Sequence, residues 1–158
     1  MKTTMLGAAL AAVAMTAATP ALARSERCAR VTEAQIAGLF DQFNAAWATK
    51  NPDTVTDLFG PDSVLLATVA ATPRTDRAGI RDYFVTFLQN SPVGTIETST
   101  IDLGCNMATR VGTWTVRLTD PASGAVNNVR ARYSFIYKFQ NGRWVIDHLH
   151  SSVLPPNP

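Results

Sequence analysis

The stretch VRARYSFIYKFQNGRWVIDHLHSS, residues 129–152, decides the fold. It predicts two β-strands joined at Asn141 and Gly142, because both residues tolerate the positive φ angles that a type I′ hairpin turn requires. Side chains alternate between the two faces of a strand, so pairing outward from this turn predicts which residues share a face. One face then carries four cross-strand pairs, which are Phe139–Trp144, Tyr137–Ile146, Phe135–His148 and Tyr133–His150.

This face is predicted to be an aromatic wall that ends in two histidines and opens into a pocket. The opposite face of the same hairpin is mixed in character and includes Arg132 and Asp147. A single β-bulge in either strand would exchange the two faces beyond it, so the choice of the pocket face depends on the absence of a bulge.

Residues 1–23 have the pattern of a signal peptide. Lys2 supplies a positive charge, residues 5–19 are apolar and rich in alanine, and Ala21-Leu22-Ala23 is a small-x-small cleavage site. A membrane-spanning helix needs about 20 apolar residues, and this run is shorter and ends at Pro20. We therefore expect cleavage after Ala23 and a periplasmic or secreted protein, made of a lead-in (24–30), one domain (31–154) and a proline-rich tail (155–158).

The charge balance excludes partners that are recognised mainly through charge. The sequence has 14 Lys and Arg against 12 Asp and Glu, a formal net charge of +2, without a strongly basic segment. Binding to nucleic acid or to an anionic membrane surface normally needs a clustered positive patch. We expect neither nucleic acid nor membrane as a partner.

The two cysteines, Cys28 and Cys105, both follow the predicted cleavage site. An even number of cysteines in an exported chain predicts a disulfide, because the compartment is oxidising. The alternative is a pair of buried free thiols. Their spacing matches no zinc site.

Helical patterns come before a run of strands. Thr32 and Gln35 form a capping box for a first helix, whose apolar stripe is Ile36, Leu39, Phe40, Phe43 and Trp47. Asn51 is predicted to cap a second helix over residues 53–59, which residues 60–62 stop. A buried strand is expected over residues 63–70, and Thr75 is expected to cap a third helix with the apolar side chains Ile80, Tyr83, Phe84, Phe87 and Leu88.

Further strands are predicted over residues 95–103, 105–119 and 126–139, separated by turn sequences. Helices followed by long antiparallel strands indicate an α+β domain, with the helices packed on one side of a curved sheet. A bent sheet over a long helix leaves a cone-shaped cavity, where binding or chemistry would occur.

Several segments, in this order and spacing, resemble the nuclear transport factor 2-like (cystatin-like cone) superfamily. More narrowly, they are similar to bacterial proteins of the SgcJ/EcaC type, which resemble the association domain of calcium/calmodulin-dependent protein kinase II. The matching segments are Asn44-Ala45-Ala46-Trp47, Arg74-Thr75, Gly79-Ile80-Arg81-Asp82-Tyr83-Phe84, Gly104-Cys105-Asn106, Ala131-Arg132-Tyr133-Ser134-Phe135, Gly142-Arg143-Trp144 and His148-Leu149-His150-Ser151-Ser152.

The resemblance implies a cone fold, a homodimer or larger homo-oligomer formed through the sheet, and a pocket between sheet and helices. In the kinase family this domain is a non-catalytic oligomerisation hub. The pocket arginines of that hub fall on Thr115, Phe135 and Ser151, so an anion would have to be bound by Arg74 or Arg132 instead. The chain has no kinase motifs. We expect neither kinase activity nor calmodulin as a partner.

The candidate ligand-binding residues are Trp47, Arg74, Tyr83, Arg132, Tyr133, His148 and His150. Arg74 and Arg132 could each bind a carboxylate or phosphate through the guanidinium fork, or Arg132 could pair with Asp147. The two histidines lack a third ligand nearby, so we expect no metal, and we expect no cofactor.

Two functions remain open at this point. The first is a self-associating module that binds a small organic molecule in its cavity. The alternative is a cofactor-independent isomerase, dehydratase or cyclase with His148 as acid or base. A third interpretation of the histidines is structural, as hydrogen-bonded residues of the core or the pocket rim.

Overall fold

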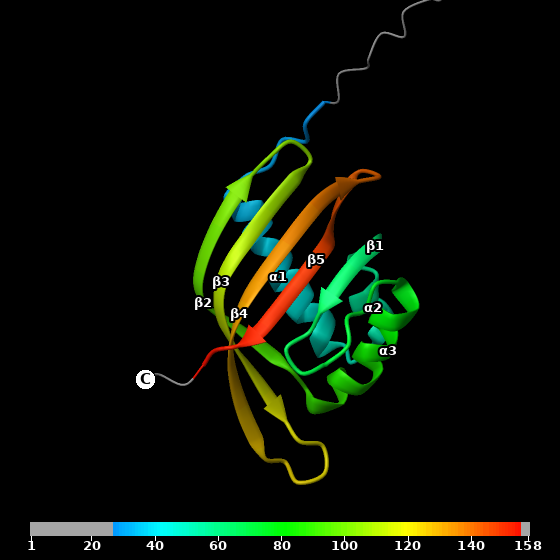
Figure 1. The fold of residues 1–158 in the computed structure, drawn as a ribbon, viewed down its shortest axis with the longest axis vertical. Coiled ribbons are helices and arrows are strands. Elements are labelled where there is room, and N and C mark those ends of the chain that lie inside the picture. The colour runs from blue at the N-terminus through cyan, green and yellow to red at the C-terminus, as the bar shows by residue number, and fades with distance from the viewer. Residues whose placement is uncertain (1–26, 156–158) are drawn as a thin grey trace, which may run out of the picture.

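A curved sheet carries one long helix across one face, and two shorter helices lie beside its edge (Figure 1). The computed structural model describes residues 27–155. The predicted leader with its cleavage after Ala23, and residues 156–158 of the tail, lie outside the described residues. The elements are α1 (Glu33–Ala48), α2 (Pro52–Thr56), β1 (Phe59–Leu66), α3 (Arg77–Phe87), a 3-10 turn η1 (Leu88–Asn90), β2 (Val93–Leu103), β3 (Met107–Thr119), β4 (Val126–Gln140) and β5 (Arg143–Val153).

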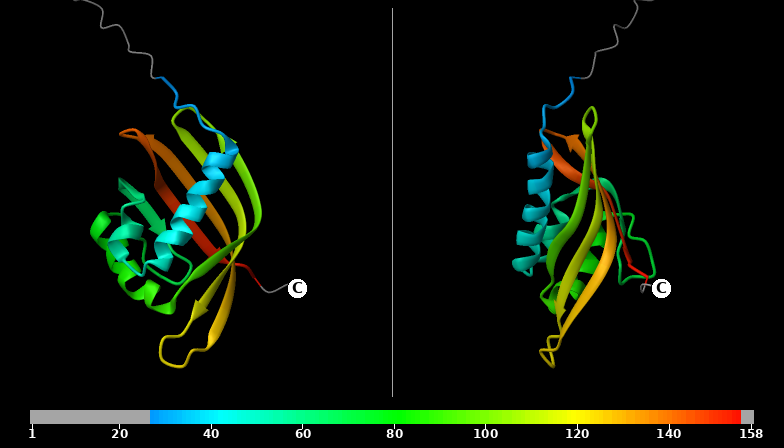
Figure 2. Two further views of the ribbon diagram at one scale, coloured as in Figure 1. Left: turned by 180° about the vertical axis from the view of Figure 1, so that it is seen from behind. Right: turned by 90° about the vertical axis from the view of Figure 1, so that its left-hand side faces the viewer.

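The five strands form one sheet in the order β1-β5-β4-β3-β2. Strands β2 to β5 pair antiparallel with their neighbours, and β1 pairs parallel with β5. Figure 2 shows α1 lying against one face of the sheet. Within residues 27–155 no helix covers the other face of β2 to β5, which we call the outer face. The predicted α+β cone with a mostly antiparallel sheet is confirmed.

The starts of the first two helices follow the sequence signals. The Thr32 hydroxyl accepts from the Gln35 backbone N–H and the Gln35 side chain accepts from the Thr32 N–H, so the capping box is confirmed. The Asn51 side chain caps α2 at Asp53. The predicted cap of α3 is wrong by one residue, because the Asp76 carboxylate, and not Thr75, accepts from the Gly79 N–H. A carboxylate is also favoured there by the helix dipole.

The boundary between α2 and β1 differs from the prediction. Helix α2 ends at Thr56, and β1 begins at Phe59, where a continued helix followed by a turn was expected. Tertiary pairing overrides the local signal, since Phe59 lies opposite Ile146 of β5 and the register is irregular between Phe59 and Val64. Within that irregular segment the Ser63 hydroxyl donates to the Gly60 and Ile146 carbonyls.

The hairpin between β4 and β5 has the predicted turn. Asn141 and Gly142 both have positive φ, at 51° and 81°. The pairs Phe139–Trp144 and Tyr137–Ile146 are confirmed. The register then shifts by one residue, because Asp147 forms a β-bulge opposite the step between Ile136 and Tyr137.

Beyond the bulge the predicted pairs Phe135–His148 and Tyr133–His150 are wrong. Phe135 pairs with Leu149 and Tyr133 pairs with Ser151, whereas His148 and His150 pair with Ile136 and Ser134. An extra residue in one strand turns every later side chain to the opposite face. Leu149 and Ser151 therefore face α1, and both histidines lie on the outer face with Arg132.

The predicted disulfide is present between Cys28 and Cys105. It attaches the lead-in segment to the turn between β2 and β3. The Ala29 N–H also donates to the Asn106 side-chain oxygen at 2.8 Å in the same place. Among the described residues, no helix is both long enough and apolar enough to span a membrane.

Candidate functional site

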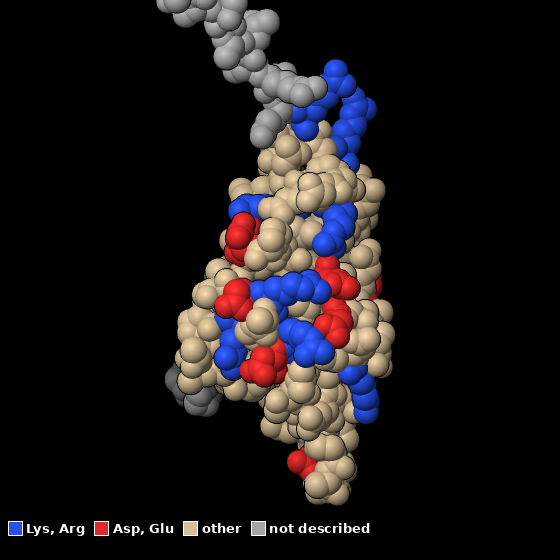
Figure 3. Space-filling view, turned by 90° about the vertical axis from the view of Figure 1, so that its right-hand side faces the viewer, with Lys and Arg blue, Asp and Glu red and all other residues tan. Residues whose placement is uncertain are grey.

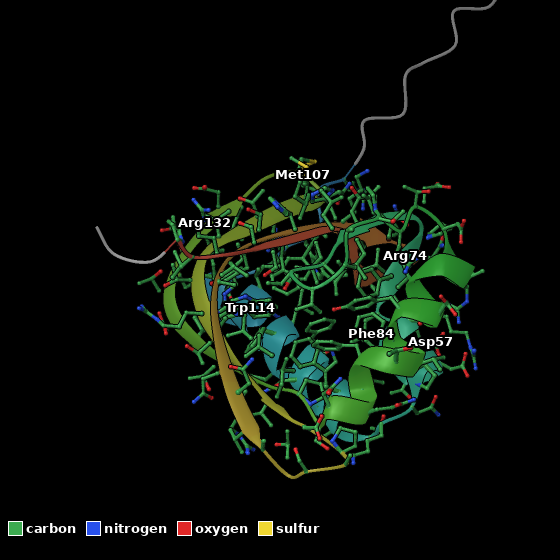
Figure 4. The ribbon with its side chains drawn as sticks, turned by 60° about the horizontal axis from the view of Figure 1, so that its bottom comes forward. Asp57, Arg74, Phe84, Met107, Trp114 and Arg132 are labelled. Atoms are coloured by element: carbon green, nitrogen blue, oxygen red, sulfur yellow. A yellow bond between two sulfur atoms is a disulfide. The ribbon has the colours of Figure 1, made fainter. Side chains whose placement is uncertain are left out.

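An inner cavity of about 30 Å³ lies between the sheet and α3. Figure 4 shows Trp114 of β3 on the sheet side of this interior and Phe84 of α3 on the helix side. Its wall is mostly apolar and aromatic, and it consists of Phe43, Trp47, Leu65, Ala67, Thr68, Val69, Tyr83, Phe84, Phe87, Trp114, Val116, Leu118, Val129, Leu149 and Ser151. A volume of this size accommodates a water molecule or the tip of a larger molecule.

The polar groups of the inner cavity meet at Ser151. Its hydroxyl oxygen accepts from the Trp114 indole Nε1 at 3.1 Å and from the Thr68 hydroxyl, and the residue is only 7% exposed. Sequence reasoning missed Ser151 and Thr68 as lining residues. The bulge at Asp147 is what brings Ser151 to this face, and its position is not evident from the residue types.

A second cavity of about 330 Å³, which we call the vestibule, adjoins the inner cavity. The two share Val69, Tyr83 and Phe87 as common lining residues. The remaining vestibule wall comes from the loop before α3 and from one side of α3, namely Ala70, Ala71, Thr72, Arg74, Asp82, Thr86 and Asn90. A molecule in the vestibule would therefore contact the same aromatic side chains that close the inner cavity.

Two donors beside these cavities have no hydrogen-bond partner among the described residues. They are the Trp47 indole Nε1 and the Arg74 Nε, and both atoms are buried. Buried polar atoms are normally satisfied, so an orphaned donor on a cavity wall indicates a place for a ligand or a water. Burial raises the pKa of the Tyr83 hydroxyl, and the Arg74 charge opposes this rise. Tyr83 thus stays protonated at neutral pH and can donate a hydrogen bond.

The structure separates the seven predicted ligand-binding residues. Trp47 and Tyr83 line the inner cavity, and Arg74 lines the vestibule together with Tyr83. Tyr133 is buried against Trp114, and its hydroxyl donates to the Thr98 carbonyl at 3.0 Å.

Arg132, His148 and His150 lie on the other side of the sheet from the cavities. Figure 4 shows Arg74 beside α3 and Arg132 across the sheet from it. A shallow groove of about 340 Å³ on the outer face is lined by Arg132, Tyr133, Ser134, His150 and Ser152. Any ligand of these residues would bind at the outer face.

The walls of the inner cavity offer little for acid–base chemistry. None of its lining residues carries a carboxyl or an imidazole group. His148, the acid or base of the enzyme alternative, faces away from it. In the described part of the chain, no group of three His, Cys, Asp or Glu side chains is close enough to hold a metal ion.

An ion pair on the outer face is expected to make stability depend on pH. Hydrogen bonds from Arg130 and then Thr115 lower the pKa of the Glu97 carboxyl from 4.5 to about 2. Because the folded-state pKa is depressed, this contribution is complete above about pH 4.5 and is lost as the pH falls towards 2. We expect the melting temperature of the wild type to fall over this range more steeply than that of Glu97→Gln. Parallel melting curves for the two proteins would contradict this prediction.

Charges of both signs alternate over the surface of α2 and α3 (Figure 3). Arg77 pairs with Asp57 at 2.5 Å, and Arg81 pairs with Asp53 at 2.6 Å. Within each exposed pair the two opposite charges neutralise one another, so the surface of α2 and α3 has no large patch of a single charge.

Comparison with known proteins agrees with this architecture. Residues 32–155 match the family model of the calcium/calmodulin-dependent protein kinase II association domain. A Xanthomonas campestris protein solved as a domain of this kind is 40% identical, with a TM-score of 0.75, covering 85% of this chain and 99% of that one. None of the curated proteins matches this chain.

Two more distant structures share the fold. The association domain of the kinase from C. elegans is 20% identical with a TM-score of 0.63, covering 77% of this chain and 95% of that one. A nuclear transport factor 2-like protein from Salmonella enterica is 15% identical with a TM-score of 0.69, covering 79% of this chain and 92% of that one. The family match takes up nearly all of the described residues, which leaves no space there for a kinase domain. This chain belongs to the calcium/calmodulin-dependent protein kinase II association domain family.

Proposed function

We propose that this protein is an exported, self-associating domain, residues 31–154, that binds a small organic molecule between its sheet and α3. The observation that carries the proposal is that the two faces of the sheet differ in their surroundings. One face covers the inner cavity and vestibule, and no element of the described chain covers the outer face. Family membership supports self-association, since relatives are named for association.

The outer face has the features of a surface that pairs with a second copy. Val111 and Met107 of β3 remain 40% and 44% exposed there. In the strand register Val111 lies opposite Ser134, which lies opposite His150, and Met107 lies opposite Lys138. Arg132 is on the same face, one pair along from Ser134. An apolar centre with a polar rim is the usual anatomy of a protein interface.

Replacing Val111 with lysine is expected to weaken self-association by at least about tenfold in the dissociation constant. Two copies paired through this face would bring the new charges together, next to the existing Arg132. The matched control is Val85→Lys on α3, where the valine is similarly exposed, at 42%, but lies outside the sheet. Native mass spectrometry and light scattering of both variants over a dilution series measure the effect. Equal association of the two variants would rule out the outer face as the interface.

The same native spectra test the binding half of the proposal. Protein purified gently from its own periplasm is expected to retain an organic molecule in both variants, since the cavities lie on the opposite side of the sheet. If a small molecule is released in a stoichiometric ratio to the protein, its mass would indicate the class of the ligand. Protein that is empty and that binds no small apolar probe would contradict ligand binding.

Export is supported by the disulfide. A bond between Cys28 and Cys105 persists in an oxidising compartment. Cell fractionation with N-terminal sequencing would show mature protein beginning at Arg24 in the periplasm or medium. Full-length protein confined to the cytoplasm would contradict export.

A further inference from the structure

We propose that two copies of this chain meet through their outer faces in one defined orientation, in which Arg132 of each copy binds the carboxylate of the partner's Asp102. This inference rests on the proposed self-association, because it names the groups that fix how the second copy lies on the outer face. The cavities on the other side of the sheet take no part in it.

The strand register places three rows of side chains across the middle of the outer face. Residues that pair across neighbouring strands point to the same face. In the order β2, β3, β4 and β5, the middle row is Thr100, Val111, Ser134 and His150, the row on one side is Asp102, Thr109, Ile136 and His148, and the row on the other side is Thr98, Thr113, Arg132 and Ser152. Apart from the two histidines, these rows hold one acidic and one basic side chain, which are Asp102 and Arg132.

Neither Asp102 nor Arg132 is neutralised within its own chain. Both residues are exposed, and neither forms an ion pair with a described residue. Asp147, the partner considered for Arg132 from the sequence, pairs with Lys138 at 2.8 Å instead. Asp102 and Arg132 are two strands and four residues apart, about 17 Å at ordinary strand spacings, so they cannot meet within one chain.

The two unpaired charges lie symmetrically about Val111. Asp102 is one strand away from Val111 on one side and two residues along the sheet, and Arg132 is one strand away on the other side and two residues along in the opposite direction. Val111 therefore marks the midpoint between an acid and a base. Its side chain is 40% exposed, so the midpoint is an apolar contact surface.

This symmetry is what a two-fold dimer requires. In an isologous interface, every contact from one residue to another is matched by the reverse contact. A two-fold axis that lies in the contact plane, passes through Val111 and is perpendicular to the line joining the charges brings Arg132 over the partner's Asp102 and Asp102 over the partner's Arg132. Val111 then meets the partner's Val111. The two ion pairs select this orientation, because other rotations about Val111 leave both charges unpaired.

The surroundings of Arg132 can receive a carboxylate. The outer-face groove of about 340 Å³ is lined by Arg132, Tyr133, Ser134, His150 and Ser152. The guanidinium can bind a carboxylate through two parallel hydrogen bonds, and the serine hydroxyls and the imidazole can add further donors beside it. None of these lining residues is acidic, so an incoming aspartate meets no like charge there.

The test reverses each charge in the full mature protein. Asp102→Arg would place two arginines together at both contacts, and Arg132→Glu would place two acids together. Each single variant is expected to weaken self-association by at least about tenfold in the dissociation constant, measured by analytical ultracentrifugation over a dilution series. The matched controls are Asp41→Arg on α1 and Lys50→Glu just after α1, which make the same charge changes at exposed positions away from the outer face. Both controls should associate like the wild type.

A mixture of the two single variants is the decisive measurement. In a dimer of one Asp102→Arg copy and one Arg132→Glu copy, both contacts again join an acid to a base. The mixture should therefore recover wild-type association as mixed dimers, which isotopic labelling of one variant identifies in native mass spectra. The double variant Asp102→Arg/Arg132→Glu should associate with itself but not with the wild type.

A milder pair of variants covers the case in which a reversed charge disturbs folding. Circular dichroism checks the fold of every variant. Asp102→Asn and Arg132→Gln remove the charges without reversing them, so each should weaken association less than its reversed counterpart. Because the two partners of one contact are removed together, the double neutral variant should associate no more weakly than the sum of the single effects predicts.

The outcomes separate this inference from the proposed function. If Val111→Lys weakens association and neither charge reversal does, the ion pair is overturned and the outer-face interface stands. If the single reversals weaken association and their mixture does not recover it, Asp102 and Arg132 do not meet, and the inference is again overturned. A wild type that stays monomeric would overturn both the interface and the ion pair.

Discussion

Replacing Phe43 with alanine is expected to lower the free energy of unfolding by about 3–5 kcal/mol. Phe43 is fully buried on α1 and lies where the helices meet the sheet. Its ring centroid is 4.7 Å from that of Trp47, 5.6 Å from that of Phe135 and 6.3 Å from that of Phe84. Alanine would leave a void that these rings, fixed on separate elements, cannot fill. Chemical denaturation monitored by circular dichroism measures the change.

The control for this prediction is Leu103→Ala. Leu103 is 43% exposed at the end of β2, so its truncation should change stability by less than about 0.5 kcal/mol. Because Phe43 also lines the inner cavity, the alanine variant should bind small apolar probes in the enlarged space. A loss below about 1 kcal/mol would show that the core rearranges around the missing ring.

Removing the disulfide through Cys28→Ser and Cys105→Ser together is expected to cost about 4–5 kcal/mol. The bond spans a sequence separation of 77 residues, and in the chain-entropy model a loop of that length greatly restricts the unfolded chain. Without the disulfide the lead-in should detach from the β2–β3 turn. The hydrogen bond from Ala29 to Asn106 would remain there, and one such bond is too weak to hold the segment in place.

Reduction provides the matched control for the disulfide. Reducing agent should lower the unfolding midpoint of the wild type to that of the double variant and leave the double variant unchanged. Equal stability of oxidised wild type and double variant would contradict the prediction. If reducing agent also lowered the unfolding midpoint of the double variant, its effect on the wild type could not be assigned to the disulfide.

Much of this fold could be predicted because helix caps and tight turns are determined by residues that are close together in sequence. The capping box at Thr32 and the positive-φ pair at Asn141 and Gly142 depend on residues within a few positions of one another, and both are confirmed. The disulfide followed from cysteine count and the predicted export. The order of helices and strands therefore follows from residue patterns alone.

The site was harder to predict because it depends on one residue of strand register. Asp147 forms the bulge and its carboxylate pairs with Lys138 at 2.8 Å, but neither residue type demands a bulge. That single insertion moved His148 away from the cavity side and brought Ser151 to it. The unsatisfied Arg74 is equally a product of tertiary contacts. Arg77 and Arg81, which are close to Arg74 in sequence, form ion pairs with Asp57 and Asp53, and the sequence does not show which of the three arginines will be paired.

The position of β5 in the sheet bears on the order of folding. β5 is the last strand to be synthesised, yet it lies between β1 and β4 and pairs with both. The parallel pairing of β1 with β5 joins segments from opposite ends of the domain, and such distant contacts form late. β1 therefore has no neighbouring strand in this sheet until the final residues are available. An emerging chain therefore cannot complete this sheet, or bury the inward faces of β1 and β4 against β5, before its last strand has been synthesised.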